Sequence, residues 1–295
     1  MRRLFLSPTE TRLRAGWRLL IQSVVYLLLA FCIGAELLIP YSFLGGKDLN
    51  GVPYMLASEV IELFAITASV FLARRLLDRR SIASLGLQLE WRLLLDLLVG
   101  LAISFVMMGL IYLGMYRMGW IHFEGFAWQS QPPLTVLANF LLILFIFIVV
   151  GWNEELLSRG YHLQTLASGL NLTWGVILSS AVFGLLHIFN PNATWISVVG
   201  IFLAGLFLAY AYLRTQRLWL SIGLHIGWNF YEGVVFGFPV SGLAVYPLTR
   251  ITVSGPSLWT GGAFGPEAGL VVLPALAVGV GLVYAYTRKR LASSG

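Results

Sequence analysis

Three groups of polar and ionisable residues lie inside otherwise apolar stretches, each at a spacing that fits one helix face. The groups are Glu154-Glu155 with Arg159, Phe183 with His187, and His225 with Asn229. A charged side chain in the middle of a membrane costs ~2.5–3.5 kcal/mol even on insertion scales, so such residues are candidate functional residues. Their clustering within residues 154–229 predicts one site assembled from several helices.

The first group separates the roles of two adjacent carboxylates. Residues four apart share a helix face, and a Glu placed before an Arg at this spacing is the favoured orientation. We therefore expect Glu155 to pair with Arg159. Glu154 is rotated by about 100° around the helix axis, so we expect it to be available for chemistry. The alternative is that both acids mark a helix end at the membrane surface.

The other two groups contribute imidazole and amide side chains. His187 follows Phe183 by four residues, and Asn229 follows His225 by four, so each pair shares a helix face. A single histidine in an apolar helix is more often a hydrogen-bonded core residue than a catalyst. Two histidines with an asparagine and a carboxylate are the components of a hydrolase. The carboxylate deprotonates water, an imidazole orients it, and neutral donors stabilise an oxyanion.

The elements that carry these residues must be membrane helices. The 295 residues are 58% hydrophobic and 11% charged, with a mean hydropathy of +0.83, which is too apolar for a soluble domain. Apolar runs long enough to cross ~30 Å of hydrocarbon occur at 17–39, 54–73, 93–115, 134–151, 172–188, 195–212, 219–238 and 268–286. We predict an all-α polytopic membrane protein with about eight transmembrane helices enclosing an intramembrane polar active-site cavity. Without repeats or linkers, 1–295 is predicted to be one domain, with a motif core at about 134–238.

The basic residues predict the orientation of these helices. With the N-terminus inside, 16 of the 19 Lys and Arg residues fall on the cytoplasmic side, and Lys47, Arg117 and Arg250 fall outside. We therefore expect cytoplasmic N- and C-termini, in the plasma (inner) membrane if the source is prokaryotic. The net charge of +6 suits anionic lipid headgroups, so membrane lipids are expected partners and nucleic acid is not. Cys32, the single cysteine, excludes an internal disulfide.

The ordered motifs E-E-x-x-x-R, F-x-x-x-H and H-x-x-x-N resemble the CPBP family of intramembrane proteases. This family contains the type II CAAX prenyl endopeptidases and bacteriocin-processing or immunity-associated proteins. The resemblance extends from Gly151 to Glu232, and residues 84–87 (Ser-Leu-Gly-Leu) resemble a short element common in the family. Ser158 departs from the aromatic residue that many members have before the arginine.

The resemblance implies a role for each motif residue. It implies that Glu154 is the general base that activates water, that His187 helps to orient the water, and that His225 and Asn229 stabilise the oxyanion. It also implies supporting roles, which fall on Glu155, Arg159 and Phe183. We therefore expect an intramembrane endopeptidase that acts near the cytoplasmic face on a membrane-associated or lipid-linked peptide or protein, including prenylated ones.

Alternatives to this reaction stay open at the level of the sequence. The favoured glutamate-type mechanism needs no cofactor, whereas a metalloprotease would hold zinc through Glu154, His187 and His225 with one open position for water. The chain lacks the H-E-x-x-H motif that would place two ligands on one helix. Non-catalytic alternatives are an immunity or scaffold protein of the same fold and, with no inverted repeat to support it, a transporter.

The depth of the motifs conflicts with eight straight spans. Glu154 follows the run 134–151 at its cytoplasmic end, whereas His187 lies at the outer end of its run. Residues 190–192 (Asn-Pro-Asn) can break the fifth helix. We therefore expect either that the helices at 172–188 and 195–212 do not both span fully, or that the fourth helix starts at a shallower depth and is longer than its apolar run. The remaining acids in apolar segments, Glu36, Glu59, Glu62 and Glu232, are expected to have supporting or structural roles.

Overall fold

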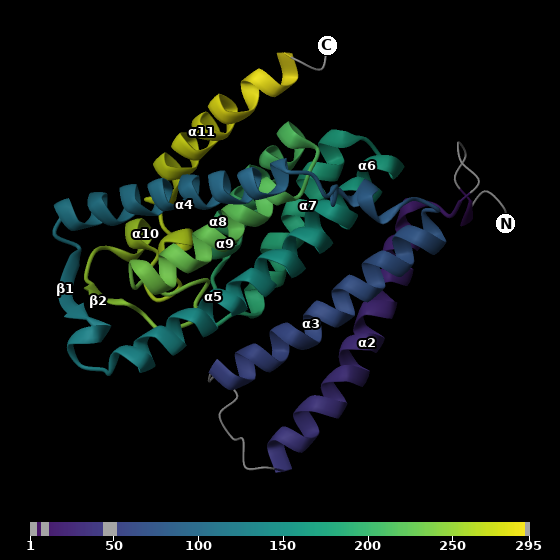
Figure 1. Cartoon of the computed structure of the whole chain (residues 1–295). Coiled ribbons are helices and arrows are strands. Elements are labelled where there is room, and N and C mark those ends of the chain that lie inside the picture. The colour runs from purple at the N-terminus through teal and green to yellow at the C-terminus, as the bar shows by residue number, and fades with distance from the viewer. Residues whose placement is uncertain (1–4, 7–11, 44–51, 293–295) are drawn as a thin grey trace. The chain divides into compact units, whose positions relative to one another are not determined.

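The computed structural model describes residues 5–6, 12–43 and 52–292, so Arg2, Arg3 and Lys47 of the charge analysis lie outside the described residues. The described chain is mostly helical (Figure 1), which confirms the predicted all-α membrane fold. It divides into two compact units. Unit 1 comprises residues 1–89 and 148–179, and unit 2 comprises residues 90–147 and 180–295. The helices α5 (Pro133–Glu155) and α7 (Leu172–Leu186) contribute to both units.

Six helices among the described residues are long and apolar enough to cross a membrane. They are Ala15–Glu36, Val52–Leu77, Arg92–Arg117, Pro133–Gly169, Leu172–Phe189 and Trp195–Thr215. The apolar helix Val272–Arg288 is shorter, and α9 (Trp219–Phe230) continues only as the short π-helix η6 (Tyr231–Val235). Each of the eight apolar runs therefore contains a helix. The number of eight spans and the polar cavity stay predictions.

In unit 1, the helices α2 (Ala15–Phe43) and α3 (Val52–Leu72) lie side by side (Figure 1). Gln22 of α2 donates from Nε2 to Ser69 Oγ of α3 at 3.1 Å, so two polar side chains pair between the apolar faces. The π-helix η1 (Ala73–Leu77) extends α3 and leads into the short helix η2 (Ile82–Leu85). The hydrophobic surfaces of α2 face away from the protein, as expected for a helix in lipid.

The end of unit 1 near η1 is held by an ionic cluster around a buried carboxylate. Asp78 accepts from Arg74 at 3.1 Å and also from Arg18. Arg74 further donates to the Ser84 carbonyl and to Gln164 Oε1, both at 2.7 Å. These bonds connect α2, η1 and the Leu-Gly-Leu element to the helix that carries Glu154. Gly86 of that element has φ of +101°, a left-handed conformation that favours glycine.

The fourth predicted helix is much longer than its apolar run. The segments α5, η4 (Leu156–Leu163, a π-helix) and α6 (Gln164–Gly169) form one continuous helix, Pro133–Gly169, of 37 residues. At 1.5 Å per residue this is roughly 55 Å, against ~30 Å for the hydrocarbon core. The structure therefore has one of the two arrangements that the depth of the motifs predicts.

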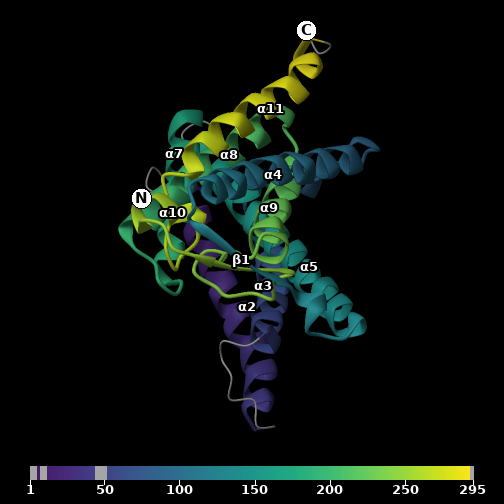
Figure 2. The same cartoon turned by 90° about the vertical axis from the view of Figure 1, so that its left-hand side faces the viewer.

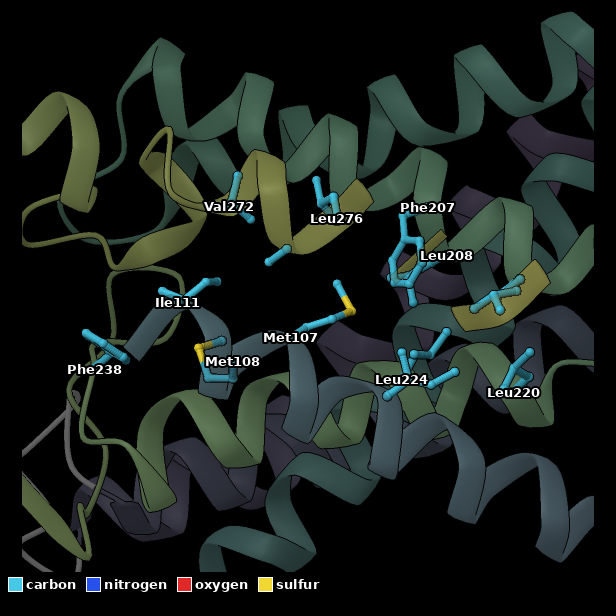
Figure 3. Close-up of a cluster of buried hydrophobic side chains, with 14 of the residues drawn as sticks. Met107, Met108, Ile111, Phe207, Leu208, Leu220, Leu224, Phe238, Val272 and Leu276 are labelled. Carbon is cyan, nitrogen blue, oxygen red and sulfur yellow. The ribbon is translucent and has the colours of Figure 1, made fainter. Parts of the chain in front are cut away.

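Unit 2 has a hydrophobic core between α4 (Arg92–Arg117), α8 (Trp195–Thr215), α9 and α11 (Val272–Ala292). Figure 3 shows Met107, Leu208, Leu224 and Leu276 meeting in this core. The side chains are apolar and tightly buried, so α9 has a fixed place among its neighbours in this unit.

Helices α4 and α9 approach each other closely through glycines. A Cβ on Gly100 would lie 2.5 Å from the Leu224 nitrogen, and a Cβ on Gly223 would lie 2.5 Å from the Leu97 carbonyl oxygen. Ser104 Oγ donates to the Leu224 carbonyl at 2.7 Å. Small residues allow membrane helices to approach at backbone distance, and they fix α9 against α4 here.

A two-stranded antiparallel sheet was not predicted from the sequence. Strand β1 (Ile121–Phe126), labelled in Figure 2, pairs with β2 (Thr249–Val253), which lies beside it in Figure 1. The pairing has a bulge between Phe123 and Gly125. Residues 239–267, between two of the predicted helices, contain β2, the short helix α10 (Ser257–Thr260) and most of η7 (Pro266–Ala268). Strands of five and six residues beside glycine and proline carry too little periodicity to be recognised.

Candidate active site

Glu154 belongs to unit 1 and lies in the interior of the long helix Pro133–Gly169, 21 residues after Pro133 and 15 before Gly169. Glu59 and Glu62 of α3 interact electrostatically with Glu154. Neighbouring Asn153 donates from Nδ2 to the Glu59 carbonyl at 3.2 Å. Three carboxyl groups therefore lie in one region of unit 1.

Glu155 and Arg159 form the ion pair that their spacing predicts. Arg159 Nη1 lies 2.6 Å from Glu155 Oε1, and the two side chains are 1% and 0% exposed. Glu155 directly precedes η4 and Arg159 lies within it, where the wider π-turns keep residues four apart near one another. Ser158, the departure from the family pattern, is also buried in this segment.

In unit 2, His187 stands where α7 ends. The helix η5 (His187–Phe189) finishes at Asn190, which has φ of −71° and ψ of 153° and precedes Pro191. The predicted break at Asn190-Pro191-Asn192 is therefore confirmed, because a residue before proline is driven out of the helical region. His187 Nδ1 lies 2.8 Å from the Phe183 carbonyl oxygen, which can only accept. Nδ1 therefore carries the proton, and Nε2 is the basic nitrogen.

The aromatic ring of Phe183 contacts both motif histidines. Its centroid is 4.9 Å from that of His187 and 6.0 Å from that of His225, the second at an interplanar angle of 89°. His225 and Asn229 are buried one turn apart on α9. The structure thus brings together the F-x-x-x-H and H-x-x-x-N motifs, with Phe183 between the two imidazoles.

A buried carboxyl that the sequence analysis did not select belongs to the same unit. Glu267 of η7 accepts from Trp228 Nε1 at 3.0 Å, and from Ser241 N at 2.9 Å and Ser241 Oγ at 2.6 Å. It also interacts electrostatically with His187. Burial raises the pKa of Glu267, while the Ser241 donors oppose that shift by stabilising the carboxylate. The sequence feature that could have indicated Glu267 is its place as a single acid in a glycine-rich segment directly before an apolar run.

The described residues give no fitting metal site. No three His, Cys, Asp or Glu side chains among them are arranged so that they could hold a metal ion. The zinc ligands considered from the sequence were Glu154 of unit 1 with His187 and His225 of unit 2. We therefore derive no step of the reaction through a metal.

Comparison with known proteins agrees with the motifs. Residues 136–231 match the family model described as type II CAAX prenyl endopeptidase Rce1-like. No curated protein and no solved structure matches the chain significantly. The matched segment holds every motif residue, namely Glu154, Glu155, Arg159, Phe183, His187, His225 and Asn229. The match confirms the resemblance of this segment to the CPBP intramembrane proteases, the group that contains the type II CAAX prenyl endopeptidases.

Proposed function

We propose that this chain is an intramembrane endopeptidase that hydrolyses a peptide bond of a membrane-associated or lipid-linked substrate. The match of residues 136–231 to the CAAX prenyl endopeptidase family carries the proposal, because the matched segment contains all the motif residues. The placement of those residues in apolar helices supports it, since polar groups are retained at such positions mainly for function.

In the proposed reaction, Glu154 takes a proton from water and the resulting hydroxide attacks the carbonyl carbon of the scissile bond. His187 accepts a hydrogen bond from that water at Nε2, because its Nδ1 proton is held by the Phe183 carbonyl. His225 and Asn229 donate hydrogen bonds to the oxyanion of the tetrahedral intermediate. The C–N bond then breaks as Glu154 returns the proton to the leaving nitrogen.

The supporting residues neutralise a charge or position an aromatic ring, and they take no part in bond breaking. Arg159 neutralises Glu155, so the second carboxylate of the pair does not compete with Glu154 for the proton. Phe183 separates and orients the two imidazoles. This division of roles between adjacent acids is what their positions on the helix predict.

We further propose that cleavage takes place near the cytoplasmic face of the membrane, with both termini cytoplasmic. The arginines at positions 74, 75, 79, 80 and 92 support this orientation, since basic residues gather on the cytoplasmic side. The family supports a prenylated substrate. In a prokaryotic cell the protein would lie in the inner membrane and act on a membrane-embedded or lipid-linked peptide.

The test is hydrolysis by the purified protein in liposomes of fluorogenic peptides that share one sequence, with and without a prenyl chain. Glu154→Gln keeps the shape of the side chain but removes the proton acceptor, so turnover should fall by ~10²–10⁴-fold with stability unchanged. Glu124→Gln, which changes an exposed acid of β1, is the matched control and should retain turnover.

Two further measurements separate the alternatives. Wild-type turnover should persist in a strong chelator, and stoichiometric zinc in the active protein would replace the glutamate mechanism with a metalloprotease one. If Glu154→Gln preserves the function of the protein in cells, a non-catalytic scaffold or immunity role is correct instead.

A further inference from the structure

A buried carboxyl group connects the two histidine-bearing elements of unit 2. Glu267 lies 36 residues beyond the end of the matched family segment and is only 5% exposed. Each of its oxygens accepts from a different part of the chain. Oε1 accepts from the Trp228 indole, and Oε2 accepts from the backbone and the hydroxyl of Ser241.

The bond to Trp228 acts on α9. Trp228 directly precedes Asn229 and follows His225 by three residues on the same helix. A hydrogen bond from its indole to a fixed acceptor limits the rotation of α9 about its own axis. Gly223 fixes another side of this helix against α4, so the direction of the His225 and Asn229 side chains is set from two sides.

The bonds to Ser241 act on the end of α7. The Ser241 carbonyl accepts from Asn190 Nδ2 at 3.0 Å, and Asn190 N donates to the His187 carbonyl at 3.1 Å. Ser241 has φ of +48°, a left-handed conformation that is costly for a residue other than glycine. Its hydrogen bonds to Glu267 and Asn190 keep the Ser241 backbone in this strained conformation.

Glu267 itself has a fixed position. The helix η7 lies against α8 so closely that a Cβ on Gly200 would overlap the Glu267 carbonyl oxygen. Gly242 N donates to the Phe264 carbonyl at 2.7 Å, which ties the two ends of the segment between Ser241 and Glu267 together. The carboxyl group also interacts electrostatically with His187. These contacts make Glu267 a rigid anchor from which other residues can be positioned.

We propose that Glu267 is a positioning residue for hydrolysis: through Trp228 it sets the face of α9 that carries His225 and Asn229, and through Ser241 and Asn190 it sets the end of α7 that carries His187. The inference rests on the proposed endopeptidase function. It assigns a role in the reaction to a residue outside the family motifs and outside the matched segment.

The experiment measures kcat and KM of the full-length protein in liposomes with the fluorogenic peptide. In Glu267→Gln the new amide NH₂ cannot accept, so either Trp228 or Ser241 loses its bond. We expect kcat to fall by ~10–100-fold, the worth of one hydrogen bond to a carboxylate, with KM within about twofold of wild type. Glu124→Gln, at an exposed acid of β1 that binds Thr252, is the matched control and should keep wild-type kcat.

A double-mutant cycle identifies the connection to α9. Trp228→Phe keeps the aromatic bulk and removes the indole N–H. If Glu267 acts through Trp228, the double variant Glu267→Gln with Trp228→Phe should lose no more kcat than the worse single variant. Should Glu267→Gln fail to fold, the two connections are tested singly: Trp228→Phe removes the bond to α9, and Ser241→Ala removes one of the two Ser241 donors and leaves the backbone bond. Each should lower kcat with KM unchanged, and wild-type kcat in both would overturn the positioning role.

Melting temperatures of the same variants give a readout without activity. Non-additive shifts in melting temperature across the cycle support the contact between Glu267 and Trp228. This holds even if the wild type hydrolyses no peptide; that result would refute the proposed endopeptidase function but not the contact. Wild-type kcat in Glu267→Gln, or additive losses in kcat, would overturn the positioning role while leaving the endopeptidase intact.

Discussion

The buried pair of Glu155 and Arg159 gives a stability prediction whose size follows from the structure. At 2.6 Å and an effective dielectric of about 20, the Coulomb attraction is roughly 6 kcal/mol. Removing each ion from water costs several kcal/mol, so most of this attraction is offset and the intact pair adds little. Deleting one partner removes the attraction but leaves the other charge buried.

Arg159→Ala should therefore lower the free energy of unfolding by ~3–5 kcal/mol, the usual cost of breaking a buried pair. This raises the population of unfolded protein by roughly 10²–10⁴-fold. The double variant Glu155→Gln with Arg159→Gln leaves no isolated charge, so it should recover part of the loss. The measurement is thermal unfolding of the purified variants in the same detergent.

The matched control is Arg217→Ala. Arg217 Nη2 lies 2.7 Å from Glu90 Oε2, but the side chains are 17% and 48% exposed. Solvent screens such a pair, and its loss costs ~0–1 kcal/mol. If Arg159→Ala melts no lower than Arg217→Ala, or if the double glutamine variant melts as low as Arg159→Ala, the assignment of a buried structural pair is refuted.

Three further predictions follow from other parts of the chain. Asn229→Ala should lower kcat by ~10²–10³-fold in the peptide assay with little change in melting temperature, and an unchanged kcat would remove Asn229 from the oxyanion site. Gly100→Ala should destabilise the protein by ~1–3 kcal/mol, because its methyl group would lie 2.5 Å from the Leu224 nitrogen. Gly114→Ala on the same helix is the control: no atom lies within 4 Å of the added methyl group, so this variant should melt at or above the wild-type temperature. In the variant Cys32→Ser with Arg80→Cys, the new thiol should react with a membrane-impermeant reagent only when that reagent can reach the cytoplasmic face of the membrane. Labelling from the opposite face would contradict the orientation predicted from the basic residues.

Local features of the site could be predicted from the sequence. The pair of Glu155 with Arg159 depends only on a spacing of four within one helix, and the break after His187 depends only on the asparagine before Pro191. The length of the long helix was underestimated because its apolar run ends at residue 151. The polar residues that follow continue the helix, since other parts of unit 1 satisfy them, as Gln164 does with the Leu85 carbonyl at 3.0 Å.

Contacts between distant segments could not be predicted in this way. Glu267 and Ser241 are joined by a bond across 26 positions, and the sequence around each residue does not indicate that the two meet. The pairing of β1 with β2 likewise joins segments more than 120 residues apart. Helical periodicity carries no information about such contacts, because they depend on how loops return to the helices.

The π-helices have a consequence for insertions and deletions. The segments Ala73–Leu77, Leu156–Leu163 and Tyr231–Val235 each contain wider turns than an α-helix, so each holds surplus residues relative to α-helical spacing. Deleting Leu157 would let the helix close into regular α-turns without breaking it. Arg159 would then stand three residues from Glu155 instead of four, a spacing that keeps both side chains on one helix face. The deletion removes a surplus residue, so Gln164 should keep its direction toward the Leu85 carbonyl. This helix should therefore lose one residue without separating the residues it holds together, whereas the same deletion in a regular α-helix would turn everything beyond it by about 100°.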